Sequence, residues 1–118
     1  LRAVGLQRMI DQRMQGVDLL QSPATRETVF GAAYTHDAVD IHKPVENLRY
    51  LWAVSGKWKL MLPGKHADDG PLVELYDLST DPHEKKNLAA DKPQEVKRIR
   101  ALVAQWWPEG ERSVTVPA

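Results

Sequence analysis

The chain has 118 residues, which is enough for one small domain with a modest hydrophobic core. Its formal net charge of zero argues against a dedicated nucleic-acid surface, which would carry an excess of Lys and Arg. It has no cysteine, which excludes disulfides and thiolate nucleophiles, and no apolar run reaches the roughly 18 residues that span a bilayer. We therefore expect neither nucleic acid nor a membrane as a partner.

Residues 1–15 predict a short helix from apolar residues at helical spacing, namely Leu6, Met9, Ile10 and Met14. A connector follows, with Gly16 and Pro23 as helix breakers. Because the chain begins inside a helix pattern, we expect it to be a piece of a longer protein. The expected division is residues 1–27, the end of a helix and its connector, and residues 28–118, one folded unit.

Four apolar runs predict β-strands at residues 28–36, 48–55, 57–63 and 72–78. The second and third runs are separated by Ser55-Gly56, which is a tight hairpin signal. In the second run, one set of alternate residues is Leu48, Tyr50, Trp52 and Val54. The other set is Arg49, Leu51 and Ala53. This alternation predicts an antiparallel sheet covered on one side.

The segment that follows the last strand carries the signals of a helix start. Asp81 is placed to cap, Pro82 suits the first helical position, and Glu84 is placed to reach back as in a capping box. These signals predict a brief helix that ends near Asn87.

A second helix start follows at Asp91, Pro93 and Gln94. The apolar stripe behind it has spacings of three and four and consists of Val96, Ile99, Leu102, Val103, Trp106 and Trp107. Pro108 is expected to end this helix, and residues 113–116 either add an edge strand or stay loose. The predicted fold class is α+β: a small antiparallel sheet of about four strands with a C-terminal amphipathic helix packed on one face.

Histidine and aspartate concentrate in "YTHDAVDIHKP", which contains His36, Asp37, Asp40 and His42. Three interpretations stay open. The favoured one is a polar strand end entering a loop; the second is ligand contact by His36 and Asp37; the third is a metal site, since imidazole and carboxylate are metal ligands.

Other apparent motifs favour structural interpretations. Ser22 is followed directly by Pro23, which does not build a nucleophile elbow. The strands interleave aromatic and basic residues, namely Trp52 and Trp58 with Lys57, Lys59 and Lys65. Such a pattern more often places Trp in the core and Lys in water than it builds a binding face. From the residues alone, we expect a domain with no self-contained active site.

The stretch "ELYDLSTDPHEKKNLA" resembles the signature near the C-terminus of sulfatases of the alkaline-phosphatase superfamily, in which L-Y-D-L runs into D-P-x-E-x-x-N-L-A. The matching residues are Leu75, Tyr76, Asp77, Leu78, Asp81, Pro82, Glu84, Asn87, Leu88 and Ala89. The segments "LRAVGL", "GVDLL", "VFGAAYTHD" and "GKWKLML" resemble other parts of that family in the same order. The resemblance covers residues 1–90 or so.

The resemblance implies a two-domain parent enzyme that is exported or of the lysosomal type. Its N-terminal catalytic domain holds a calcium ion and a formylglycine made from the Cys or Ser of C/S-x-P-x-R. Neither is expected in this chain, because Ser22-Pro23-Ala24-Thr25-Arg26 has its proline one place too early. The chain then corresponds to the C-terminal subdomain, which is inactive by itself, docks against the catalytic domain and lines one rim of the substrate pocket.

Within the family, "YTHD" and "NLRYLWAV" are most similar to N-sulfoglucosamine sulfohydrolases and to other heparan-type or bacterial polysaccharide sulfatases. There a histidine at the strand end reaches the sugar, which implies a substrate-binding role for His36, with Asp37 and His42 as its companions in the loop. No catalytic residue and no metal ligand is implied in this chain. One departure is that relatives often read Y-R-W where this chain has Tyr50-Leu51-Trp52, with the arginine at Arg49.

Two other functions stay open. In the first, the chain is the C-terminal part of another hydrolase of the superfamily, such as a phosphodiesterase or phosphonate hydrolase. In the second, it is a non-enzymatic binding module. The expected partners are the N-terminal catalytic domain of the same chain and a sulfated sugar. Without that domain, the exposed apolar surface is expected to promote self-association of the chain.

Overall fold

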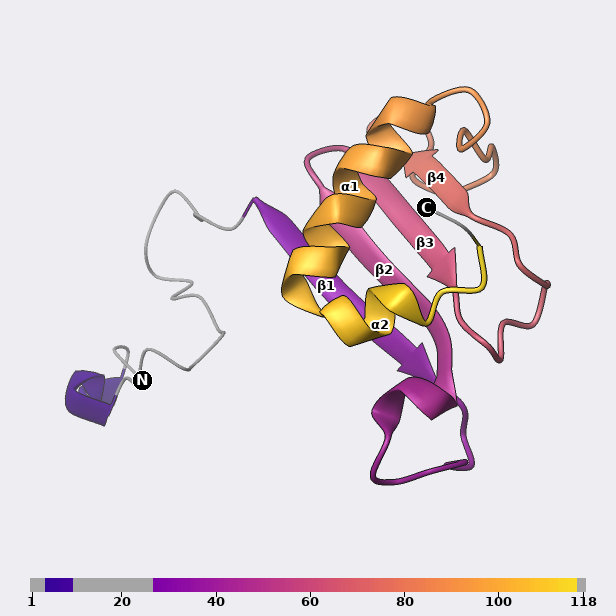
Figure 1. Ribbon diagram of the computed structural model, residues 1–118. Helices are drawn as coiled ribbons and strands as arrows, with labels where there is room; N and C mark the ends of the chain where they lie inside the picture. Colours follow the sequence, from indigo (N-terminus) through magenta and orange to yellow (C-terminus); the bar gives the residue numbers. More distant parts are fainter. Residues whose placement is uncertain (1–3, 10–26, 117–118) are drawn as a thin grey trace.

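The computed structural model describes residues 4–9 and 27–116, which form a four-stranded sheet with two helices packed on it (Figure 1). The strands are β1 (Thr28–Tyr34), β2 (Leu48–Ser55), β3 (Trp58–Pro63) and β4 (Glu74–Asp77). The helices are α1 (Pro93–Trp106) and α2 (Pro108–Arg112), with 3-10 turns at Gln7–Met9 and Pro44–Asn47. Neighbouring strands run antiparallel in the order β1-β2-β3-β4. The predicted α+β class is confirmed.

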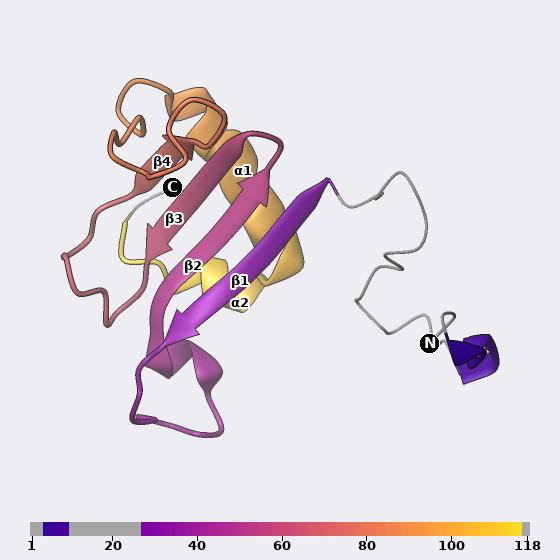
Figure 2. The ribbon, with the colours of Figure 1, turned by 180° about the vertical axis from the view of Figure 1, so that it is seen from behind.

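Both helices lie on one face of the sheet, and Figure 2 shows that no helix of the described chain covers the other face. No helix among the described residues is long and apolar enough to cross a membrane. The helix expected over residues 1–15 is described only at 4–9, as the 3-10 turn Gln7–Met9; its remainder and most of the 16–27 connector lie outside the described residues.

The hairpin between β2 and β3 fixes which side chains face the helices. Ser55 is paired with Trp58, so the turn residues are Gly56 and Lys57. Gly56 has a φ of +58°, a conformation that glycine adopts at little steric cost. This register places Leu51 opposite Leu62, and both side chains are fully buried.

The core lies between the sheet and α1. Its fully buried members are Leu48, Leu51, Ala53, Leu60, Leu62, Leu75, Ile99 and Val103. Burying each leucine side chain contributes on the order of 1.5–3 kcal/mol to folding. The other set of the β2 alternation, Tyr50, Trp52 and Val54, projects from the opposite face and is half-buried. The Trp-bearing set is therefore the one that the helix does not cover.

The predicted amphipathic helix is confirmed as α1, with Ile99 and Val103 buried against the sheet. It begins at Pro93, but its N-cap is Lys92, which makes no side-chain cap, and not Asp91. Pro108 ends α1 as expected and also begins α2, because proline suits a first helical turn. The ring of Trp106 stacks on Phe30 of β1 with centroids 5.1 Å apart.

The brief helix expected from Asp81 is wrong. The segment consists of turns, and Glu84 has a φ of +54°, which an α-helix does not accommodate. The carboxylate of Asp81 accepts hydrogen bonds from the backbone N–H groups of Lys85 and Lys86. Glu84 does not reach back to Asp81 but forms an ion pair with Lys59 of β3.

The tail after α2 adds no strand within the described chain. The backbone N–H of Thr115 donates to the carbonyl of Pro63 at the end of β3, with N and O 3.1 Å apart. The guanidinium of Arg100 donates to the carbonyl of Val116 at 2.8 Å. These two bonds hold the tail against the domain.

Two glycines each lie beneath a tryptophan ring. A Cβ atom on Gly31 would lie 2.2 Å from Cζ2 of Trp52 on the open face of the sheet. A Cβ atom on Gly110 would lie 2.2 Å from Cε3 of Trp107, where α1 gives way to α2. At both positions the absence of a side chain lets the indole pack directly on the backbone.

Candidate functional site

The loop that joins β1 to β2, residues 35–47, carries all the site residues that the sequence singled out. It lies at the end of the sheet opposite the β2–β3 hairpin (Figure 1). The backbone N–H of Thr35 donates to the carbonyl of Asn47 at 2.9 Å, and this bond closes the loop at its root. The predicted strand to His36 thus ends two residues early, at Tyr34.

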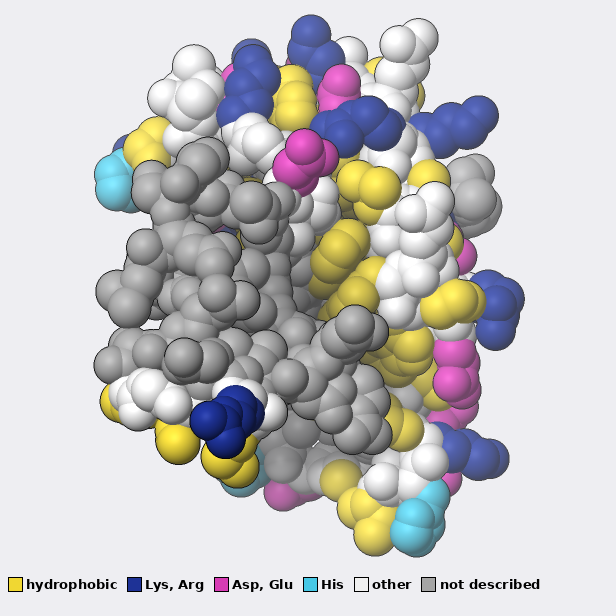
Figure 3. Space-filling model, turned by 90° about the vertical axis from the view of Figure 1, so that its left-hand side faces the viewer, with side chains coloured by type: hydrophobic (Ala, Val, Ile, Leu, Met, Phe, Trp, Pro, Cys, Tyr) yellow, Lys and Arg dark blue, Asp and Glu magenta, His cyan; other side chains and the backbone are white. Residues whose placement is uncertain are grey.

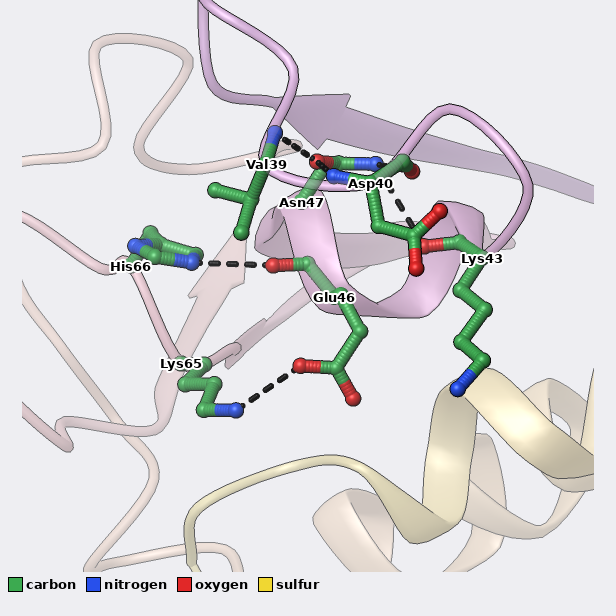
Figure 4. Close-up of polar contacts among 7 residues, drawn as sticks. All are labelled: Val39, Asp40, Lys43, Glu46, Asn47, Lys65 and His66. Carbon is green, nitrogen blue, oxygen red and sulfur yellow. Dashed lines mark hydrogen bonds and ion pairs between the residues drawn. The ribbon is translucent and has the colours of Figure 1, made fainter.

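The buried side chain of Asn47 organises the interior of the loop (Figure 4). Its Oδ1 accepts hydrogen bonds from the backbone N–H groups of Val39 and Asp40. Its Nδ2 donates to the carbonyls of Asp40, at 2.7 Å, and Lys43, at 3.4 Å. One amide thereby bonds to four backbone groups of the loop, and it fixes the path of the loop.

A second loop, residues 64–70, supports the first from the side. The Nε2 of His66 lies 2.9 Å from the carbonyl oxygen of Glu46 and donates to it, while the Nζ of Lys65 lies 2.8 Å from the Glu46 carboxylate (Figure 4). The hydrogen bond from Lys65 is the main reason that the pKa of Glu46 is lowered. Sequence reasoning missed the contacts of Lys65 and His66, because these residues lie 19 and 20 positions from Glu46 in the chain. It also missed the role of Asn47, because the partners of Asn47 are set by the path of the loop.

The predicted substrate-binding residues lie on the outside of this loop. The side chains of His36 and Asp37 are fully exposed, and Nδ1 of His36 lies 3.4 Å from a carboxylate oxygen of Asp37. His42 is also exposed, and its backbone N–H donates to the carboxylate of Asp40 at 2.8 Å. Over residues 27–116, no hydrogen bond or ion pair joins His42 to His36 or Asp37.

The loop presents hydrogen-bonding groups and no assembled metal centre. Among the described residues, no group of three or more His, Cys, Asp or Glu side chains is placed to hold a metal ion. The exposed imidazoles of His36 and His42 are instead available to donate to, or accept from, a ligand that approaches this end of the sheet.

The charged side chains on the strands are paired. Arg49 forms an ion pair with Asp68, whose backbone N–H donates to the hydroxyl of Tyr50 at 2.9 Å. Lys57 lies 3.0 Å from the carboxylate of Asp77, and its ammonium lies 4.8 Å from the ring centroid of Trp58. With Lys59 held by the carboxylate of Glu84, the strands present little unpaired positive charge to an anionic polymer.

The segment that resembles the sulfatase signature lies at the other end of the sheet and uses its polar side chains on its own backbone. The carboxylate of Asp77 accepts hydrogen bonds from the backbone N–H and the hydroxyl of Ser79, and the hydroxyl bond is the main cause that lowers the pKa of Asp77. The pKa of Asp81 is lowered by the N–H groups of Lys85 and Lys86.

Asn87 completes this arrangement. Its Oδ1 accepts from the N–H groups of Leu75, at 3.0 Å, and Ala89, at 2.9 Å, and its Nδ2 donates to the carbonyl of Val73 at 3.0 Å. The side chain therefore ties the turn to β4. Tyr76, which follows Leu75 in β4, is buried. Burial, together with a hydrogen bond to Glu74, raises the pKa of Tyr76 to about 12.

Comparison with known proteins adds no relative. No model of a protein family matches this chain, and no curated protein matches it. Its function is therefore argued from the residues and their geometry.

Proposed function

We propose that this chain is the C-terminal, substrate-rim subdomain of a sulfatase that hydrolyses sulfate esters or N-sulfates of sugars. The residues that resemble the family signature, together with four further segments in the same order, are the basis of the proposal. The calcium ion and formylglycine belong to the catalytic domain of the parent enzyme. By itself this chain binds and orients, and it cleaves nothing.

The observation that supports the proposal most is the position of His36. Its side chain is fully exposed just beyond the end of β1, and its Nδ1 lies 3.4 Å from a carboxylate oxygen of the neighbouring Asp37. The loop behind it is fixed by Asn47. A donor held in this way can meet a ligand without first breaking other contacts, and a hydrogen bond to a charged group contributes about 1.5–3 kcal/mol.

The signature itself contributes to the fold and not to the substrate. Asp77, Asp81 and Asn87 already have backbone partners, so releasing any of them to a sugar would expose unsatisfied groups. Contact with a sulfated sugar is therefore assigned to the 35–47 loop. Such contacts position the substrate and set specificity, while bond cleavage takes place elsewhere.

The first test uses the parent enzyme that contains this chain. His36→Ala is expected to lower kcat/KM for a sulfated glucosamine substrate by about tenfold, with an unchanged Tm, because the side chain is exposed. His83→Ala is the matched control, since His83 is also exposed but belongs to the segment between β4 and α1, which lies at the opposite end of the sheet (Figure 1). Equal kinetics for both variants and the wild type would remove the contact role of His36.

The isolated chain provides a second readout. In a titration with a sulfated glucosamine disaccharide followed by NMR, the imidazole signals of His36 and His42 should move while that of His83 stays. Release of inorganic sulfate by the isolated chain would contradict the proposal, because it would require a catalytic centre within these residues.

A further inference from the structure

The strand β1 forms one edge of the sheet, and its pairing with β2 is regular from Thr28 to Ala33, with a shift of register only between Ala33 and Tyr34. It lies at the end of the order β1-β2-β3-β4, so half of its backbone N–H and C=O groups point away from β2, and no other described strand pairs with them. Its seven residues, TVFGAAY, contain no charge and no proline. Charges, prolines and short length are the usual protections against pairing with another chain.

The other edge strand shows the contrast. β4 has four residues, two of which are the acidic Glu74 and Asp77. It is also covered at one end by the turn that Asn87 ties to it. Only β1 combines length, neutrality and an open side in the described sheet.

Apolar side chains continue along this edge. Figure 3 looks at the β1 side of the molecule and shows hydrophobic side chains gathered in a band, with Lys and Arg side chains near the top. Val29 is 40% exposed and Trp106, which stacks on Phe30, is 39% exposed. An addition to this edge would therefore bury apolar surface as well as backbone groups.

We propose that β1 pairs antiparallel with β1 of a second copy of this chain, about a two-fold axis at Gly31, so that the two sheets become one continuous sheet. This inference rests on β1 alone and does not depend on the proposed sulfatase function. It gives a defined surface to the self-association that the sequence led us to expect.

The register follows from the residues. With Gly31 opposite its own copy, Val29 lies opposite Ala33 and Phe30 opposite Ala32. Each larger side chain meets a small one on both faces of the extended sheet. In this register, odd-numbered residues pair with odd-numbered residues and even-numbered with even-numbered. Alternate residues of a strand direct their N–H and C=O groups to the same side, so the backbone groups that point away from β2 in each copy meet those of the other copy.

Charge favours a second copy over an unrelated peptide. A two-fold interface brings the same strand against itself, so a charged residue next to the axis would lie close to the like charge of its own copy. The strand β1 has none, and this neutrality is what an isologous pairing requires. A charged partner peptide would find no complementary side chain on this strand.

The test measures the mass of the full 118-residue chain in solution by light scattering and sedimentation over a range of concentrations. The wild type should form a dimer, and Val29→Lys should shift the association constant at least tenfold toward monomer. Val39→Lys is the control, because Val39 is 63% exposed but belongs to the 35–47 loop. A monomeric wild type, or a dimer that Val29→Lys leaves intact, would overturn the proposal.

The absence of cysteine allows a test of register. In the proposed pairing, Val29→Cys combined with Ala33→Cys places each new thiol opposite its partner, within the Cα separation of about 4.4–6.8 Å that a disulfide needs. With Val29→Cys alone, the two thiols lie about 13 Å apart along the strands, from four residues at about 3.3 Å each. The double variant should give a covalent dimer under mild oxidation and the single variant should not; equal cross-linking of both would reject this register.

Discussion

The two ends of the sheet use the same polar side chains in different ways. At the end that holds the turn after β4, Asp77, Asp81 and Asn87 all bind nearby backbone groups. At the other end, the buried amide of Asn47 fixes the 35–47 loop from the inside, and the carboxylate of Asp40 accepts from the backbone N–H of His42. The outward side chains there, such as His36, are left exposed.

This difference teaches that the residues which match a family signature are not the ones available to a ligand. The signature after β4 is conspicuous because a turn with several capping side chains allows few substitutions. The loop at the other end has no such pattern, since one buried amide does the work of several caps. A search for ligand contacts should therefore concentrate on the 35–47 loop.

The difference between the two ends of the sheet can be tested most directly at Asn47 and Asn87. Asn47→Ala should lower the free energy of unfolding by about 2–3 kcal/mol, because it removes the acceptor of the Val39 and Asp40 backbone N–H groups in a packed loop. Asn87→Ala should cost about 1 kcal/mol, because its side chain is exposed and water can replace it. Urea denaturation of both variants gives these values, and a larger loss for Asn87→Ala would reverse our ranking of the two ends.

Acid should loosen the signature turn. The lowered pKa values mean that the folded state favours the ionised forms of Asp77 and Asp81. Their contribution to the free energy of unfolding is therefore complete above the ordinary pKa near 3.9, and it is lost as the pH falls through the lower pKa values of the folded state. Protection of the Lys85 and Lys86 amides from hydrogen exchange should fall below about pH 4. In Asp81→Asn the protection should be weaker already at neutral pH; unchanged protection in acid would mean that other contacts hold the turn.

The smallest effect is expected from Tyr76, since its phenol stays neutral and its contribution to stability does not change near neutral pH. A pKa raised to about 12 means that the folded state favours the neutral phenol, so this contribution is complete below the ordinary value near 10 and is lost as the pH rises through about 12. An absorbance titration of the phenols should show a step near pH 12 that Tyr76→Phe removes. Retention of that step in the variant would assign it to another tyrosine.

The sheet and the long helix could be predicted because local pattern and tertiary packing agree there. The stripe through Ile99 and Val103 has helical spacing, and both residues are buried in α1. The turn between β2 and β3 was signalled by Gly56, whose conformation few other residues adopt.

Prediction failed where one local signal had two structural solutions. The spacing of Asp81 and Glu84 fits a capping box, but Asp81 binds N–H groups four and five residues on without a helix. A single turn of helix fixes several dihedral angles for one hydrogen bond, so a cap alone does not make it stable. The place of Asn47 at the centre of a loop was not predictable either, because its partners are set by how the chain returns into β2.

The tryptophans that rest on Gly31 and Gly110 constrain how this protein can evolve. Any larger residue at either glycine would displace an indole ring, so each glycine can be lost only together with its tryptophan. Substitutions at Gly31 and Trp52 are thus coupled, and so are substitutions at Gly110 and Trp107. Descendants of this sequence should keep or exchange both members of a pair together.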